Sequence, residues 1–242
     1  MTHPASTTHP DAPSRLANWC DRFIEAGWLA AVVITPLFFN IFSLGVFEAD
    51  KLTLLRAIVL LMAAAWGIRR LDAARAPADD RTVTARTPLV APVLALIAVT
   101  AVSTAFSVAP RISLFGDHTQ RFASAITLLS VAVLFFMIAQ GLRTRAQFDR
   151  LITTILLTSL PISLYGLAQA LRGDPFPWGS PTDERVTSTL GNPIFLAAYL
   201  CFPFFVGLGR LAEAFAARPL RLVDLARVAL LLPIVVLDGV VV

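Results

Sequence analysis

The sequence predicts an all-α membrane protein, a polytopic bundle of transmembrane helices with six complete spans and a truncated seventh. Two observations support this class. Of the 242 residues, 57% are hydrophobic and only 15% are charged, whereas a soluble domain has about 25% charged residues. In addition, apolar runs of about twenty residues recur along the chain, and a run of this length crosses the core of a bilayer as a helix.

The predicted spans follow one another with short polar connections. The six complete spans are Trp28–Phe47, Leu52–Ile68, Leu89–Phe106, Phe122–Gln140, Leu151–Leu171 and Leu190–Leu208, and the truncated seventh is Val228–Val242.

Residues 1–26 are predicted to form a cytoplasmic tail. In its second half Leu16, Trp19 and Phe23 recur at helical spacing between charged residues, a pattern typical of an amphipathic helix that lies in the membrane interface. Residues 27–242 are predicted to form one transmembrane domain, which makes membrane lipids an expected partner.

The basic residues indicate the orientation of the chain. The formal net charge is +4, and cytoplasmic loops of membrane proteins collect Lys and Arg. With a cytoplasmic N-terminus, 14 basic residues fall inside and 6 outside, the outer ones being Lys51, Arg56, Arg111, Arg121, Arg172 and Arg185. The surplus of positive charge is therefore explained by topology, and no nucleic-acid partner is expected.

Several enzyme classes lack their motifs in this sequence. No G-x-x-x-x-G-K-[ST] loop for nucleotide phosphates and no H-E-x-x-H zinc motif occur. The three histidines are His3, His9 and His118, and the two cysteines are Cys20 and Cys201. We therefore expect no metal site, no cofactor and no disulfide framework.

The stretch Thr182–Leu200 combines charge, turn residues and the start of a span. Gly191-Asn192-Pro193 precedes a long apolar run, and Asn followed by Pro is typical of a helix start. A helix N-terminus attracts anions, phosphate in particular, and Arg185 adds a full positive charge nearby. The alternative is an ordinary capped membrane helix with a loop arginine near lipid headgroups.

The predicted outer loops contain four arginines, Arg111, Arg121, Arg172 and Arg185, and two of them stand just before a span. Guanidinium groups bind phosphate through paired hydrogen bonds. This set would suit a lipid diphosphate whose chain lies in the bilayer and whose head faces the outer loops.

The segment R-V-T-S-T-L-G-N-P-I-F-L-A-A-Y-L at Arg185–Leu200 resembles the O-antigen ligase and O-antigen polymerase family of bacterial inner-membrane glycosyltransferases. The loop S-L-F-G-D-H-T-Q-R at Ser113–Arg121 is similar to an earlier outer loop of that family, and the likeness in hydropathy order covers about Gly27 to Leu211.

The resemblance implies a function in the synthesis of lipopolysaccharide or another cell-surface polysaccharide. Family members transfer or polymerise glycans carried on undecaprenyl diphosphate at the periplasmic face, without a metal or a nucleotide. It implies that Arg185, with Asn192, Arg121 and Arg111, binds the lipid diphosphate. It also implies a multi-pass protein of the bacterial inner membrane with a cytoplasmic N-terminus.

Two features depart from the family pattern. Position 194 is Ile where many members have Asn, and the large outer loop with the family's further Arg and His positions is expected after residue 242. The chain is therefore expected to be the N-terminal portion of a larger membrane protein or a degenerate member of the family. Its catalytic residues are unknown, and the 242-residue chain alone is expected to transfer no glycan. The alternative function is a non-catalytic membrane transporter or scaffold for a lipid-linked or anionic solute. Transporters often contain inverted repeats, and the absence of a visible repeat favours the transferase.

Overall fold

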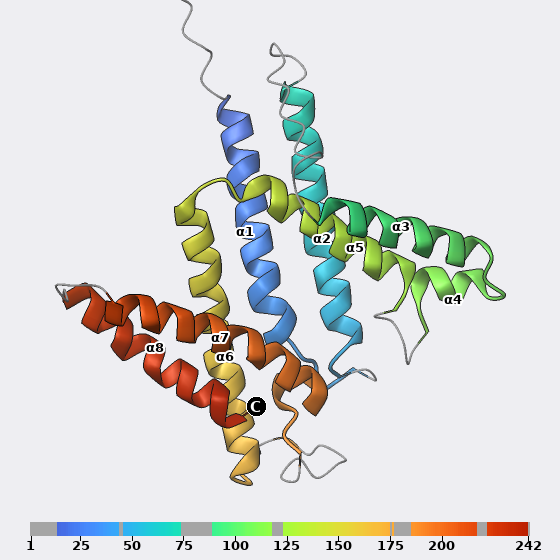
Figure 1. Ribbon diagram of the computed structural model, residues 1–242. Helices are drawn as coiled ribbons and strands as arrows, with labels where there is room; N and C mark the ends of the chain where they lie inside the picture. Colours follow the sequence, from blue (N-terminus) through green and yellow to red (C-terminus); the bar gives the residue numbers. More distant parts are fainter. Residues whose placement is uncertain are drawn as a thin grey trace, which may run out of the picture.

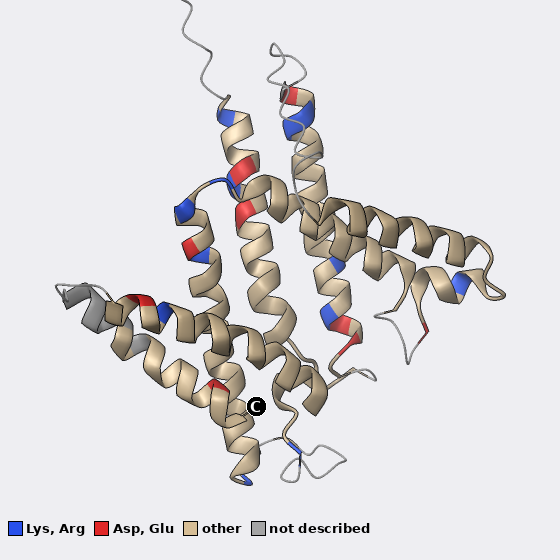
Figure 2. Ribbon diagram, in the orientation of Figure 1, with Lys and Arg blue, Asp and Glu red and all other residues tan. Residues whose placement is uncertain are grey.

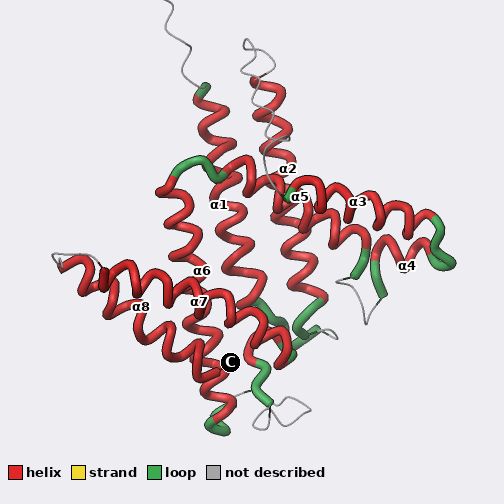
Figure 3. The backbone as a smooth tube through the Cα atoms, in the orientation of Figure 1, coloured by secondary structure: helices red, strands yellow, loops and turns green. Residues whose placement is uncertain are grey.

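The computed structural model describes residues 14–43, 46–73, 89–117, 123–174, 176, 185–216 and 222–241, and within these ranges every regular element is helical (Figure 3). The all-α class is therefore confirmed. The elements in chain order are α1 (Arg15–Leu37), α2 (Ala49–Ala73), α3 (Val90–Ala105), α4 (Pro110–Phe115), α5 (Ala125–Gly141), α6 (Arg145–Ala170), the 3-10 turn η2 (Ser188–Leu190), α7 (Pro193–Ala216) and α8 (Leu222–Val241).

Helices α1 and α2 form an antiparallel pair at the centre of the molecule (Figure 1). Trp28 of α1 and Met62 of α2 are fully buried in the same apolar cluster as Met137 of α5. Gly27 allows this close approach, because a Cβ atom there would lie 2.5 Å from Cγ of Met62. Small residues at such contacts let membrane helices pack backbone to backbone.

The remaining helices lie on opposite sides of this pair in Figure 1. Helix α6 packs on α1, and α7 and α8 form a hairpin that packs on α6, while α3, α4 and α5 lie toward α2. In the same view α3 and α5 cross the direction of α2 steeply, and α7 and α8 cross that of α6. The apolar helices therefore do not form one parallel bundle.

Three described helices are long and apolar enough to cross a membrane: Ala49–Asp72, Arg145–Ala170 and Pro193–Ala216. The other apolar stretches, Val90–Ala105, Ala125–Gly141 and Leu231–Val241, are shorter helices. The structure thus bears out a helical chain with membrane-length segments, and it does not establish six complete spans.

The first predicted span differs most from the structure. Helix α1 runs without a break from Arg15, in the predicted tail, and ends at Leu37 instead of Phe47. In the turn after α1 the Asn40 side chain donates to Oδ2 of Asp50 (2.6 Å) and accepts from the N–H of Phe42 (3.0 Å). These bonds fold the chain back toward α2, a preference of Asn that hydropathy does not register.

The helix ends separate into two groups, and Figure 2 shows most charged residues near them. At one end, ion pairs join α1 to α2 (Asp21–Arg69, 2.8 Å), α1 to α6 (Glu25–Arg150, 2.5 Å) and α6 to α7 (Asp149–Arg210, 2.5 Å). The predicted inner segments meet there. The opposite ends of α1, α2, α6 and α7 meet around η2, near the predicted outer residues Lys51 and Arg185.

Candidate functional site

Gln169, fully buried near the C-terminal end of α6, fixes the segment that leads into α7. Its Oε1 accepts hydrogen bonds from the backbone N–H groups of Thr187 (3.1 Å) and Ser188 (2.7 Å), and its Nε2 donates to Oδ2 of Asp174 (2.9 Å). An unpaired N–H buried in this position would cost about 1–3 kcal/mol. One amide side chain therefore joins the residue pair Thr187 and Ser188 to Asp174.

The hydroxyl groups of this segment bind main-chain carbonyls of distant helices. Ser188 Oγ donates to the carbonyl of Ile162 in α6 (2.7 Å), and Thr189 Oγ1 donates to the carbonyl of Pro36 in α1 (2.8 Å). Lys51 of α2 donates through Nζ to the Thr189 carbonyl (3.2 Å). Ser188 and Thr189 are buried, so they hold the segment against three helices and do not face a ligand.

The backbone around η2 is under conformational constraint. Ser188 has φ of 48° and Gly191 has φ of 72°, a left-handed region that residues with a side chain rarely adopt. A Cβ atom on Gly191 would also overlap the ring of Phe47. Glycine is therefore required at 191 for two independent reasons.

Helix α7 begins at Pro193, as the sequence predicts. Oδ1 of Asn192 accepts a hydrogen bond from the N–H of Ile194 (2.8 Å), and the Asn192 carbonyl accepts from the N–H of Leu196 (3.0 Å). Asn192 is thus the N-cap of α7, and its predicted role in binding a lipid diphosphate stays a prediction.

The structure brings together only part of the predicted binding set. Arg185 is exposed at the beginning of the described segment 185–192, three positions before η2. Arg111 is exposed on α4, which packs on α3 and α5, whereas η2 packs on α1, α6 and α7. Described contacts therefore do not place Arg111 beside the Arg185–Asn192 segment. Arg121 lies outside the described residues.

An aromatic cluster beside Gln169 was not foreseen from the sequence. Tyr165 donates through its hydroxyl to Oδ1 of Asp174 (2.9 Å), and its ring stacks on Phe39 (6.3 Å between centroids), which meets Phe176 edge to face (5.6 Å). The only local signal was Gly173-Asp174 just after the C-terminal end of an apolar helix, where Asp often closes a turn. Asp174 does so through the N–H of Phe176 (3.0 Å).

Arg56 of α2 is tied to the start of α5. Its Nη2 donates to Oγ of Ser124 (3.0 Å) and to Oγ1 of Thr127 (2.5 Å). Both hydroxyls belong to the first turn of α5, where Ser124 is the N-cap. Arg56 therefore joins two apolar helices near their ends.

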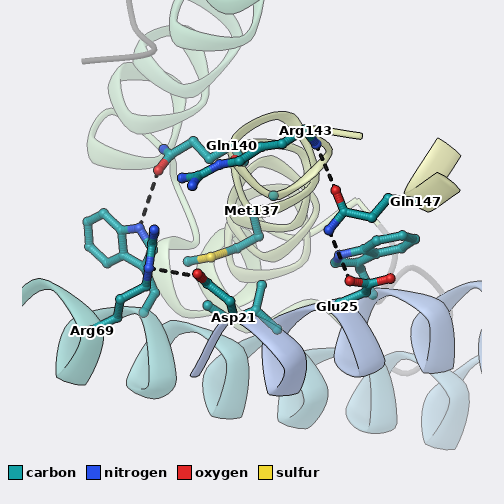
Figure 4. Close-up of a pocket in the computed structure, with 11 residues that line it drawn as sticks. Asp21, Glu25, Arg69, Met137, Gln140, Arg143 and Gln147 are labelled. Carbon is teal, nitrogen blue, oxygen red and sulfur yellow. Dashed lines mark hydrogen bonds and ion pairs between the residues drawn. The ribbon is translucent and has the colours of Figure 1, made fainter. Parts of the chain in front are cut away.

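At the opposite end of the molecule a cavity of about 70 Å³ lies between α1, α2 and α5, near the N-terminus of α6 (Figure 4). Gln147 connects its walls, since Nε2 donates to Glu25 (2.9 Å) and Oε1 accepts from the N–H of Arg143 (2.9 Å). Burial alone would raise the pKa of Glu25, but the hydrogen bonds from Gln147 and Arg150 and the charge of Arg150 hold that pKa below its ordinary value.

The same cavity contains one buried donor without a partner. Trp28 is fully buried and its Nε1 has no hydrogen-bond acceptor in the described structure. A Cβ atom on Gly141 would lie 3.7 Å from this nitrogen, so the glycine leaves space beside it. A space of this size holds a few water molecules, and the carboxylates around it are already paired. Within the described ranges, no three His, Cys, Asp or Glu side chains come together as a metal site would require.

Comparisons of the chain with protein-family models, with curated proteins and with solved structures give no match.

Proposed function

We propose that this chain acts in a bacterial inner-membrane glycan transferase of the O-antigen ligase or polymerase type, which handles a glycan carried on undecaprenyl diphosphate at the periplasmic face. The observation that carries the proposal is the order of the segment before α7. Gln169, Ser188 and Thr189 bind this segment to α6 and α1, and Arg185 stands exposed at its beginning.

The hydrogen-bond donors near the start of α7 are of the kind that binds a diphosphate. The guanidinium of Arg185 offers a fork of N–H donors, and α7 begins nearby with the partial positive charge of a helix N-terminus. Phosphate oxygens accept hydrogen bonds from both kinds of donor. We further propose that Asn192 contributes from the N-cap position of α7 and that Arg121 and Arg111 extend the site from the preceding outer loop.

The proposed topology has a cytoplasmic N-terminus and six complete spans, which α8 follows. The separation of the predicted inner and outer helix ends into two groups supports it. The shorter apolar helices α3 and α5 would then complete the crossing with their flanking residues.

The test replaces Arg185 by Lys in the complete protein. Lys keeps the charge and loses the fork, and a charge-assisted hydrogen bond is worth roughly 1.5–3 kcal/mol. We expect Arg185→Lys to insert normally and to transfer glycan on the order of a hundredfold more slowly.

Arg172→Lys is the matched control, because Arg172 lies in the same predicted outer loop. Lys and Arg are equally compatible with the backbone conformation at position 172. This variant should transfer at nearly the wild-type rate. The measurement is glycan transfer from an undecaprenyl diphosphate donor at equal protein levels. An Arg185→Lys variant as active as wild type would leave Arg185 as a headgroup or topology residue.

A further inference from the structure

Helix α8 carries a carboxyl group into the apolar interior of the molecule. Asp238 has no exposed surface, although it lies in the apolar stretch Leu231–Val241. Glycines in α6 and α7 allow α8 to pack closely against both helices. A Cβ atom on Gly166 of α6 would lie 2.9 Å from Val241, and one on Gly207 of α7 would lie 2.6 Å from Val235.

Two serines of α6 bind both oxygens of this carboxyl group. Ser159 Oγ lies 2.8 Å from Oδ2 of Asp238, and Ser163 Oγ lies 2.5 Å from Oδ1. Both serines are fully buried. They lie four residues apart on one face of the helix. Their two hydroxyl groups therefore form a preformed binding site for one carboxyl group.

No positive charge balances Asp238 within the described structure. Lys, Arg and His side chains form no ion pair with it there. Of the helices packed on α8, α6 presents Ser159 and Ser163, and α7 contributes Tyr199, which packs on the same buried cluster as Val241 of α8. The buried Tyr199 hydroxyl has no hydrogen-bond partner among the described residues.

The hydrogen atoms in this cluster can be counted. Ser159 has one hydroxyl hydrogen, yet its Oγ lies within bonding distance of two acceptors, the Leu156 carbonyl (3.0 Å) and Oδ2 of Asp238 (2.8 Å). If Ser159 donates to the carboxylate, the Leu156 carbonyl loses that bond. If Ser159 donates to Leu156, Oδ2 needs a hydrogen of its own to bond to Ser159 Oγ.

We propose that Asp238, Ser159 and Ser163 form an exchangeable proton-binding site between α6 and α8. On uptake, one proton from water forms an O–H bond at Oδ2, the carboxyl group becomes neutral, and Oδ2 donates to Ser159 Oγ. The Ser159 hydroxyl turns to the Leu156 carbonyl, while Ser163 continues to donate to Oδ1. On release the sequence reverses, and the site gains one negative charge.

The physical basis of the site is the cost of an unpaired charge in an apolar interior. The neutral arrangement satisfies every hydrogen-bonding group of the three residues without a cation. This inference is independent of the proposed glycan transfer, because it requires neither Arg185 nor a lipid diphosphate.

The experiment is infrared difference spectroscopy of the complete protein in lipid nanodiscs during a pH titration. We expect a protonated-carboxyl stretching band that shifts in D₂O and that disappears in Asp238→Asn. The amide of Asn reproduces the shape of the neutral carboxyl group, so this variant should fold. Ser159→Ala retains Asp238 and should shift the band, because it removes the acceptor of the carboxyl hydrogen.

Thr158→Ala is the matched control. Thr158 is buried next to Ser159, but its hydroxyl donates to the Thr154 carbonyl (2.7 Å) and does not touch Asp238. The band should remain unchanged in this variant. A titratable band that persists in Asp238→Asn would overturn the proposal. So would a band that Na⁺ abolishes at constant pH, since the site would then hold a metal cation. If Asp238→Asn fails to fold, an unshifted band in folded Ser159→Ala overturns it as well.

Discussion

Gly191 occupies a position where the backbone and a neighbouring ring both exclude a side chain. Its φ of 72° lies in the left-handed region, and Phe47 fills the space that a Cβ atom would need. The turn that carries Arg185 toward α7 therefore depends on this residue as much as on the hydrogen bonds of Gln169.

We expect Gly191→Ala to lower the free energy of unfolding by about 1–3 kcal/mol, because the alanine is strained and must displace Phe47. Gly67→Ala is the control, since nothing lies within 4 Å of a Cβ atom there and alanine favours a helix over glycine by about 0.5–1 kcal/mol. Thermal unfolding of the purified variants in detergent measures both. Equal stability of Gly191→Ala and wild type would show that the turn relaxes freely.

Some residue roles follow from local sequence and others depend on the whole fold. The start of α7 at Asn192-Pro193 was predictable, because a cap and its helix are neighbours in sequence. Gln169 and Ser188 could not be paired in advance, since they are 19 positions apart and meet only through the packing of α6 against η2. The lipid diphosphate site remains a prediction, since Arg121 lies outside the described residues.

At the scale of elements, glycines determine how closely α8 approaches its neighbours. Gly207→Ala should place a methyl group against Val235 and Leu156, at 2.6 and 3.3 Å for the unrelaxed structure. We expect a loss of about 1–3 kcal/mol of stability from such overpacking.

Gly209→Ala provides the control in the same helix. No atom lies within 4 Å of a Cβ atom at this position, so its stability should equal that of wild type or exceed it slightly. Comparison of thermal unfolding midpoints separates the packing effect from helix propensity. If both variants unfolded at the same temperature, α8 would not be packed against α7 at Gly207.

The contact between α1 and α6 predicts a dependence of stability on pH. The Glu25 side chain is 19% exposed and is bound by Arg150 and Gln147, and its pKa is lowered in the fold. A lowered carboxyl pKa means that the stabilisation is complete at neutral pH and is lost as the pH falls below the ordinary value of about 4.3.

Glu25→Gln should therefore lower the free energy of unfolding by about 1–2 kcal/mol at neutral pH. When the pH is lowered, the free energy of unfolding should fall less in this variant than in wild type. Glu213→Gln is the matched control, because Glu213 is largely exposed and, among the described residues, pairs with Arg210 of its own helix (3.3 Å). Thermal unfolding between neutral and acidic pH gives the comparison. Parallel pH profiles for wild type and Glu25→Gln would contradict the assignment.

The lengths of the elements show where hydropathy reasoning succeeds and where it fails. The long helices α2, α6 and α7 coincide with predicted spans, because a long apolar run has few alternatives to a helix. The end of α1 was placed ten residues too late, since Phe38–Phe47 is apolar enough to continue a span while Asn40 turns the chain back toward Asp50. Hydropathy alone also says nothing about the steep crossings in Figure 1.

At the scale of the whole molecule, the two groups of helix ends define two faces. The ion-paired ends of α1, α2, α6 and α7 are separate from the ends gathered around η2. The positive-inside pattern predicts that the ion-paired face is cytoplasmic.

Cysteine labelling in intact cells tests this orientation. In a background without Cys20 and Cys201, a membrane-impermeant reagent should label a cysteine at Ser180 and should not label one at Ala78 until the membrane is opened. Labelling of position 78 alone in intact cells would reverse the topology, and with it the proposed periplasmic position of Arg185.

The bond between Thr189 and the carbonyl of Pro36 joins residues 153 positions apart, and this has a consequence for biosynthesis. The ribosome synthesises α1 long before residue 189. During translation the Pro36 carbonyl, in the last turn of α1, therefore lacks its hydrogen bond from Thr189. Water, lipid headgroups or an insertase would have to satisfy that group in the interval. The α1–α2 hairpin is thus expected to enter the membrane early and to reach its final geometry only after the start of α7 has been synthesised.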